Sequence, residues 1–304
     1  MSKVITVFGA TGNQGGSVIQ AILADPNLSK EYKVRGITRD VFKESAKRLA
    51  SQGVEMIAAD LSSPPQLLNA IQGSHTVFLV TNFWETTNKE IEIRQGKAVT
   101  DICKETGVQH LIFSSLQGFT ELTGGRLSNV AYFDSKAEIE KYIRNSGMPA
   151  TFVLAGFFMT NFSESLKKRG DVLTLEWPVD PDKAKVPLLD VNEDTGKFVK
   201  AVIKKFPSTV GKRVLMAEAY YTPKQIVAEI AETLGIKTAA VKIPQDSFTS
   251  FLAPELTQGT IENLLVMEAE GYYGGESLEP SLAILEEKPV SWKEFVQKNA
   301  SSFF

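Results

Sequence analysis

The chain has 304 residues, of which 43% are apolar and 23% are charged, so it can bury a substantial core in one large domain or in two. A net charge of −3, without a run of basic residues and interleaved aromatics, excludes direct nucleic-acid binding from the functions that we expect. No apolar stretch approaches the roughly 20 residues of a membrane span.

The first residues lack the apolar core of a signal peptide, and the single cysteine, Cys103, excludes an internal disulfide. We therefore expect a cytoplasmic protein without a membrane partner, or a nuclear one if it is regulatory. Two histidines and one cysteine at unsuitable spacing predict no metal site.

Short apolar runs alternate with amphipathic stretches over the first 155 residues. Starting with a strand, the expected strands and helices cover 4–9, 15–24, 32–38, 41–52, 54–60, 65–71, 76–81, 88–106, 110–115, 134–146 and 150–156. This alternation is typical of βαβ units with right-handed crossovers. The sequence therefore predicts a doubly wound α/β domain over residues 1–156.

After Gly156 the alternation loosens. Residues 171–190 indicate strands separated by turns, and the segment at about 190–212 contains an amphipathic helix that we expect to pack back on the main sheet. A strand–helix–strand unit over 212–244 and helical stretches over 256–274 and 291–300 follow. We expect residues 157–304 to form mostly a smaller α+β lobe that binds substrate.

A glycine-rich turn, "GATGNQGG", follows the first expected strand directly. Gly9, Gly12 and Gly15 permit a tight turn and a close approach of the backbone to a pyrophosphate at a helix N-terminus. Because this turn lies between a strand and a helix of a βαβ unit, it predicts dinucleotide binding.

The end of the second expected strand, "GITRD", indicates which dinucleotide is bound. Arg39 stands where an NAD site has an acidic residue, and a guanidinium can bind a 2′-phosphate and stack on adenine. Lys43 can add a second charge, whereas Asp40 can face the ribose or cap the next helix. We predict NADP, with Asp60 and Leu61 beside the adenine.

Tyr132 and Lys136, in "YFDSK", are four residues apart and lie on one face of a helix if the helix includes both. A phenol beside an ammonium can donate a proton to a carbonyl that is being reduced. The same spacing also fits a core aromatic residue next to a surface lysine, and a helix that begins after residue 132 would leave Tyr132 facing solvent.

The glycine spacing, the "TRD" after the second strand, and the segments "EIRQGKAVTDICKETGVQHLIFSSL" and "YFDSKAEIEKYIRNSGMPATFVLAGFFMTNF" together resemble the NmrA-like family. This family is an atypical branch of the short-chain dehydrogenase/reductase group. The resemblance implies a Rossmann domain with strand order 3-2-1-4-5-6-7 and a small C-terminal substrate lobe. Some members reduce small molecules, quinones or dyes with NADPH, and others are silent NADP sensors that bind a transcription factor or signalling protein.

The resemblance also implies roles for individual residues. The residues that it assigns to the pyrophosphate are Gly9, Thr11, Gly12, Asn13, Gln14 and Gly15. Arg39 is assigned to the 2′-phosphate and Lys136 to the nicotinamide ribose. The residues that it brings to the middle of the cofactor and to the nicotinamide are Thr81, Asn82, Ala155, Gly156 and Phe157.

The resemblance also implies a Ser–Tyr–Lys set for catalysis, because Ser114 and Ser115 end the fifth expected strand, where the wider dehydrogenase group has a serine that holds the substrate oxygen. In this set Ser115 orients the substrate, Tyr132 donates the proton, and Lys136 lowers the pKa of the tyrosine. Sensor-like members of the family often lack the tyrosine. Ser115 can equally be a strand-end hydroxyl that satisfies a backbone group, and Lys136 can face solvent.

Aromatic residues follow the fourth and sixth expected strands, and we expect some to line a substrate pocket and others to pack in the core. The pocket candidates are Phe83, Trp84, Phe158, Met159 and Phe162. The sequence thus favours an NADPH-dependent reductase of a small, largely apolar carbonyl, imine, quinone or enone. The alternative is a non-catalytic NADP(H) sensor with a protein partner.

Overall fold

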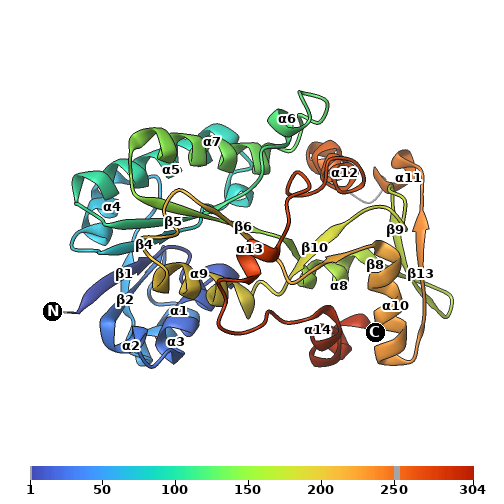
Figure 1. The fold of residues 1–304 in the computed structure, drawn as a ribbon, viewed down its shortest axis with the longest axis horizontal. Coiled ribbons are helices and arrows are strands. Elements are labelled where there is room, and N and C mark those ends of the chain that lie inside the picture. The colour runs from blue at the N-terminus through green and yellow to red at the C-terminus, as the bar shows by residue number, and fades with distance from the viewer. Residues whose placement is uncertain (1, 250–253) are drawn as a thin grey trace.

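Seven parallel strands form the main sheet of the protein, in a computed structural model that describes residues 2–249 and 254–304 (Figure 1). The strands are β1 (Lys3–Val7), β2 (Tyr32–Thr38), β3 (Glu55–Ala58), β4 (Thr76–Leu79), β5 (His110–Ser115), β6 (Ala150–Ala155) and β11 (Arg213–Met216). Their order is β3-β2-β1-β4-β5-β6-β11. This confirms the predicted doubly wound fold, and the order is the one that the family resemblance implies, with β11 as seventh strand.

Helices cover both faces of this sheet (Figure 1). One face carries α4 (Pro64–Ile71), α5 (Lys89–Glu105) and α7 (Ala131–Ser146), and the other carries α1 (Asn13–Ala24), α3 (Glu44–Ser51) and α9 (Asp194–Lys204). Each face buries its own apolar cluster. Every residue of β5 and β6 is buried, as expected for strands that are covered on both sides.

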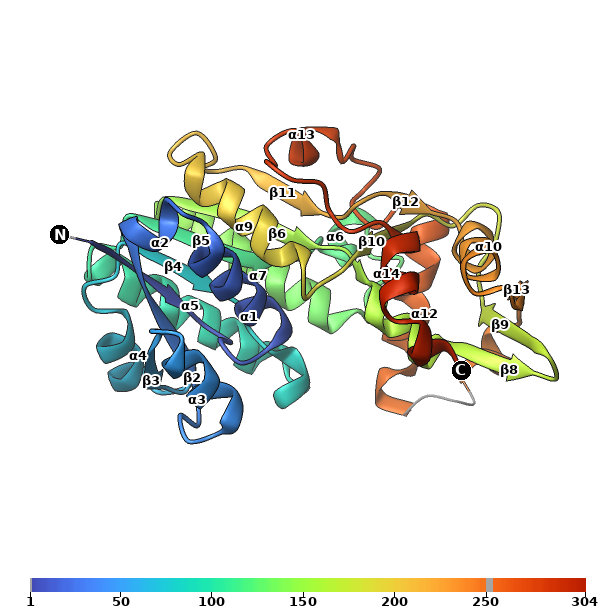
Figure 2. The same cartoon turned by 90° about the horizontal axis from the view of Figure 1, so that it is seen from below.

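The remaining chain forms a smaller part on one side of the main sheet (Figure 2). Two three-stranded sheets build it: β12 (Tyr220–Tyr221), β10 (Val186–Leu189) and β7 (Phe157–Phe158), and β13 (Lys237–Lys242), β9 (Val172–Trp177) and β8 (Leu166–Arg169). Its helices are α8 (Phe162–Ser165), α10 (Pro223–Leu234), α11 (Gln245–Thr249), α12 (Pro254–Glu268) and α14 (Trp292–Lys298), whereas α13 (Glu279–Leu282) packs beside β11 of the main sheet.

Short elements complete the chain. A four-residue helix, α6 (Phe119–Leu122), follows β5, α2 (Leu28–Glu31) precedes β2, and three 3₁₀ turns are η1 (Phe83–Glu85), η2 (Met159–Asn161) and η3 (Ala300–Phe303). Among the described residues, no helix is both long enough and apolar enough to cross a lipid bilayer.

Helix α9 lies in the segment at about 190–212 and packs directly on α1. The backbone N–H of Gly196 donates to Ser17 Oγ at 2.8 Å, and a Cβ at residue 196 would lie 2.2 Å from the Ser17 carbonyl oxygen. Lys204, at the end of α9, pairs with Asp25 at 2.5 Å. The close helix contact therefore requires glycine at position 196.

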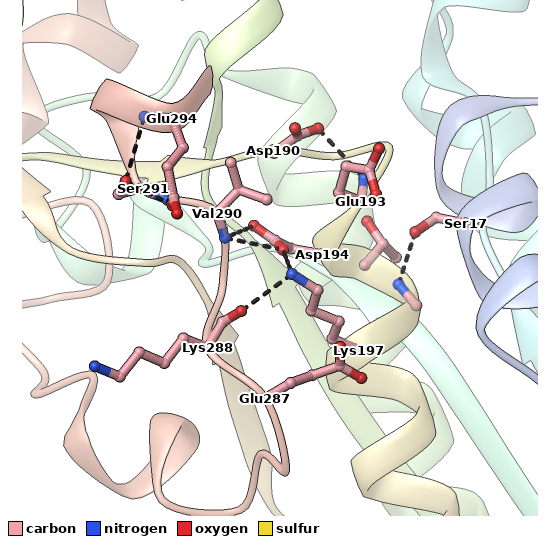
Figure 3. Close-up of polar contacts among 12 residues, drawn as sticks. Ser17, Asp190, Glu193, Asp194, Lys197, Glu287, Lys288, Val290, Ser291 and Glu294 are labelled. Atoms are coloured by element: carbon pink, nitrogen blue, oxygen red, sulfur yellow. Dashed lines mark hydrogen bonds and ion pairs between the residues drawn. The ribbon is translucent and has the colours of Figure 1, made fainter. Parts of the chain in front are cut away.

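The C-terminal segment is attached to the first turn of α9 through a buried carboxylate (Figure 3). Val290 N donates to Asp194 Oδ1 and Oδ2, at 3.2 and 3.0 Å. Lys197 Nζ pairs with Asp194 Oδ1 at 2.8 Å and donates to the Lys288 carbonyl oxygen at 3.0 Å. Burial raises the pKa of Asp194 to about 6, although Lys197 opposes this change.

Candidate active site

The glycine-rich turn after β1 has the geometry of a phosphate-binding loop. Gly9 has a φ of 65°, and a Cβ at Gly15 would lie 2.3 Å from the Gly9 carbonyl oxygen, so both positions require glycine. Gly12 caps α1 without any side-chain hydrogen bond to the first turn of the helix. The backbone N–H groups in the first turn of α1 can therefore bind an anion, and the loop fits the pyrophosphate of a dinucleotide.

Side chains of the loop also fit this role. Thr11 and Asn13 are exposed beside Gly12. A hydrogen bond fixes the side chain of Gln14, because Ser114 Oγ, at the end of β5, donates to Gln14 Oε1 at 2.7 Å. The structure thus connects Ser114, rather than Ser115, to the loop.

At the end of β2, Arg39 forms an ion pair with Glu85 of η1, and 61% of its side chain is exposed. Lys43 is exposed at the N-cap of α3. The Asp40 carboxylate closes its own turn, since Oδ1 accepts from the Phe42 N–H at 2.9 Å. Two cations at the strand end, Arg39 and Lys43, can bind a 2′-phosphate.

Asp60 and Leu61, predicted beside the adenine, follow β3. Asp60 Oδ1 accepts from the Ser62 N–H at 2.7 Å, and Leu61 is half-buried against the core. These residues form a turn at the same edge of the sheet as the loop. Their assignment to the adenine stays a prediction.

Lys136 lies in a buried cluster centred on Glu92 of α5. Its ammonium pairs with Glu92 Oε1, which also accepts from Thr81 Oγ1 at 2.7 Å. Ser135 Oγ donates to Glu92 Oε2. Burial lowers the pKa of Lys136, and the neighbouring carboxylate opposes this change.

Tyr132 is in the first turn of α7, so it precedes Lys136 by one helical turn, but its hydroxyl has a different neighbour. Asn263 Nδ2, from α12, donates to Tyr132 Oη at 3.0 Å. The tyrosine ring lies 4.9 Å from the Trp84 ring and 5.9 Å from the Phe83 ring, between centroids. Burial raises the pKa of Tyr132 to about 12.

Ser115 is fully buried, and its hydroxyl donates to Glu140 Oε2 of α7 at 2.6 Å. Arg144 and Arg213 bind the other oxygen of Glu140, each at 2.8 Å. Successive residues of a strand face opposite sides of the sheet, which explains why Ser114 and Ser115 have different partners. The structure does not assemble Ser115, Tyr132 and Lys136 into one hydrogen-bonded set.

Backbone packing fixes the chain after β6. Gly156 N donates to the Met216 carbonyl oxygen at 2.9 Å, and a Cβ there would lie 2.6 Å from the Pro187 carbonyl oxygen. Ala155 is buried, and Phe157 is half-buried with its ring near Trp177. Their assignment to the nicotinamide stays a prediction.

Aromatic residues predicted for the pocket wall fall into two groups. Trp84 is 53% exposed, Phe158 is half-buried, and Phe83 is buried beneath Trp84. Met159 and Phe162 each have 0% of their surface exposed, so the expectation that they line a pocket is wrong. Phe162 packs between Trp177 and Trp292 in the core, where no substrate can touch it.

Asn82 is exposed at the N-cap of η1 and forms no side-chain capping bond. Three further residues of the site were missed by sequence reasoning: Glu85, Glu92 and Asn263. Glu92 gives a usable signal, because it shares the buried face of α5 with Val99 and Cys103 at helical spacing. Asn263 gives none, since 131 residues separate it from Tyr132.

The family model described as NmrA-like family matches residues 1–296. The NmrA-like family domain-containing oxidoreductase ptmS of Penicillium ochrochloron is 33% identical, over 78% of this chain and 74% of that protein. The chain belongs to the NmrA-like family. Membership agrees with the glycine-rich loop and with the strand order described above.

Solved structures share the fold. NmrA, a negative transcriptional regulator crystallised with NADP, has a TM-score of 0.83 at 22% identity, over 98% of this chain and 95% of that one. The Citrobacter sp. triphenylmethane reductase complexed with NADP(H) has a TM-score of 0.75 at 21% identity, over 97% of this chain and 99% of that one. At these identities the likeness shows the architecture alone.

Proposed function

We propose that the protein is an NADP-dependent reductase of a small, largely apolar compound with a carbonyl, imine, quinone or enone group. The environment of Tyr132 carries this proposal. Its hydroxyl oxygen accepts from Asn263, so the phenolic proton is available to a substrate atom. The relative named as an oxidoreductase supports the same class of activity.

The residues have separate tasks in this proposal. The loop from Gly9 to Gly15 binds the pyrophosphate and Arg39 binds the 2′-phosphate. A bound reduced nicotinamide supplies the hydride. Trp84 presents an apolar surface to a flat substrate, and Tyr132 donates its proton to the atom that gains negative charge.

The pKa of Tyr132 sets the protonation state in which this residue meets a substrate. Since burial raises it to about 12, the phenol is protonated at neutral pH and acts as a hydrogen-bond donor and acid. The hydrogen bond from Asn263 opposes this rise and stabilises the phenolate as the proton leaves. Asn263 thus takes a task that the sequence assigned to Lys136.

A second candidate function is a non-catalytic regulator that binds NADP(H) and a transcription factor or signalling protein. The specific observation in its favour is that Ser115 and Lys136 are committed to Glu140 and Glu92. A protein that senses the level of NADP(H) needs the phosphate-binding loop but no proton donor. The structural likeness to the transcriptional regulator NmrA is compatible with this candidate.

NADPH oxidation over a panel of aldehydes, imines, quinones and enones tests the first candidate. Tyr132→Phe should lower turnover by roughly 10²–10⁴ with NADPH affinity almost unchanged, because only a proton donor is lost. Tyr142→Phe is the matched control, since Tyr142 lies farther along α7 and donates to Asp101.

Unaltered turnover in Tyr132→Phe would show that Tyr132 is not the proton donor and would leave that role to water or to the substrate. If no compound of the panel supports NADPH oxidation and a pull-down recovers one specific protein partner, the regulator becomes the better candidate function.

A further inference from the structure

The ion pair between Arg39 and Glu85 spans the opening of the phosphate loop. Arg39 follows β2, and Glu85 lies in η1 after β4. Strands β2 and β4 are the two neighbours of β1, which ends in the loop. Because all three strands are parallel, the pair joins the two sides of the crevice at the carboxyl edge of the sheet, where dinucleotides bind in this architecture.

Glu85 and a 2′-phosphate therefore compete for one cation. The Glu85 carboxylate uses NH1 of the Arg39 guanidinium, and a phosphate binds best when the planar fork faces it fully. Two anions on one guanidinium repel each other, so phosphate binding favours separation of Arg39 from Glu85. A neutral 2′-hydroxyl exerts no such repulsion and leaves the pair in place.

Separation of the pair has a consequence for the neighbouring residue of η1, Trp84. This turn has three residues, Phe83, Trp84 and Glu85, so Arg39 holds its last residue. Trp84 packs edge-on against Phe83 at 5.5 Å and lies 4.9 Å from the Tyr132 ring, between centroids. A change at Glu85 is thus one residue from the aromatic contact with the proposed proton donor.

We propose that Glu85 competes with the 2′-phosphate of the cofactor for Arg39, and that this competition makes η1 sensitive to the 2′-phosphate. NADP releases η1 from Arg39 and changes the contact between Trp84 and Tyr132, whereas NAD leaves both unchanged. Glu85 thereby sets how strongly the protein discriminates between the two cofactors. This inference rests on the NADP binding of the proposed function.

Calorimetric titration with NADPH and NADH tests the competition. Glu85→Gln removes the competing charge and should raise NADPH affinity by roughly two- to fivefold, the size of an exposed ion pair, with NADH affinity unchanged. The matched control is Glu90→Gln, which removes an exposed acid from the first turn of α5 without touching Arg39. It should leave both affinities unchanged.

Tryptophan fluorescence tests the link to the aromatic contact. The probes are 2′,5′-ADP and 5′-AMP, adenosine fragments that lack the nicotinamide and differ in the 2′-phosphate. Trp177 and Trp292 are buried and Trp84 is 53% exposed, so Trp84→Phe isolates its signal. At saturation, 2′,5′-ADP should shift the emission of the unmodified protein but not that of Trp84→Phe, and 5′-AMP should shift neither.

Unchanged or weaker NADPH binding by the Glu85→Gln variant would overturn the inference, and so would an equal rise in NADH affinity. The proposed function would remain intact in either case, provided that the unmodified protein binds NADPH. The same holds if both fragments shift Trp84 emission equally. Failure of the unmodified protein to bind NADPH and 2′,5′-ADP would overturn the inference together with the cofactor assignment of the proposed function.

Discussion

Glu92 accepts hydrogen bonds from three side chains of the candidate active site, Thr81, Ser135 and Lys136, although only 1% of its own side chain is exposed. A buried carboxylate needs such partners, because its removal from water costs several kcal/mol. The cluster joins α5, the start of α7 and the end of β4. Lys136 is therefore a structural cation in this arrangement, whatever it adds to cofactor binding.

Glu92→Gln keeps the size of this side chain and removes the counter-ion of a buried ammonium. We expect a loss of about 3–5 kcal/mol in the free energy of unfolding, measured by urea denaturation. The double variant Glu92→Leu with Lys136→Met replaces both charges by apolar groups and should recover part of that loss, since Thr81 and Ser135 still lose their acceptor. Glu90→Gln on the same helix should stay within about 0.5 kcal/mol of the unmodified protein. A Glu92→Gln variant of unaltered stability would contradict the role of this pair.

Local sequence patterns predicted part of the candidate site but not the partners of its residues. The i, i+4 spacing places Tyr132 and Lys136 one turn apart on α7, and the glycines build the loop. Their partners come from elsewhere: Glu92 lies 44 residues before Lys136, and Asn263 comes 131 residues after Tyr132. Strand alternation predicts that Ser114 and Ser115 face opposite sides, but only tertiary packing decides which one meets Gln14.

Elements differ from their expected bounds where turns compete with helices. Helix α7 begins at Ala131 instead of Asp134, which brings Tyr132 inside the helix. Helix α3 begins at Glu44 instead of Val41, because Asp40 accepts the Phe42 N–H and holds those residues in a turn. Hydrophobic periodicity predicted the helices themselves, whereas their first residues depend on such local hydrogen bonds.

The contact between α1 and α9 provides a test of packing between elements. Gly196→Ala puts a methyl group where the Ser17 carbonyl oxygen lies 2.2 Å away, so the helices must separate. We expect a loss of about 1–3 kcal/mol or more in thermal or urea unfolding. Gly16→Ala on α1 is the control, since its Cβ meets nothing closer than 3.6 Å and alanine favours helix. Equal effects of the two substitutions would show that the helix contact is looser than the structure indicates.

For the whole molecule, the attachment of the C-terminal segment to α9 makes global stability depend on pH. The pKa of Asp194 is about 6 in the folded chain, above its ordinary value of 3.8. The folded state therefore binds more protons than the unfolded state between these values, and stability falls as the pH rises from about 4 to 6. At neutral pH the charged Asp194 costs on the order of 2–3 kcal/mol.

Asp194→Asn removes this titration. The free energy of unfolding of the variant, relative to the unmodified protein, should therefore rise by roughly 2 kcal/mol between pH 4.5 and pH 7, measured by urea denaturation at each pH. Asp182→Asn is the control, because Asp182 is exposed and pairs with Lys224. A stability difference that is independent of pH would show that Asp194 is ionised alike in both states.

The seventh strand, β11, and helix α9 come after β7 to β10, so the chain leaves the main sheet and returns to it before it ends in the smaller part. Recombination between relatives is constrained by this path. A crossover at residue 156 would set α9 and β11 of one parent against α1 and β6 of the other, and it would separate Gly196 from the Ser17 that fits it. Exchange of the smaller part alone needs at least three crossovers, near residues 156, 190 and 216, so that residues 190–216 stay with the parent that supplies residues 1–156.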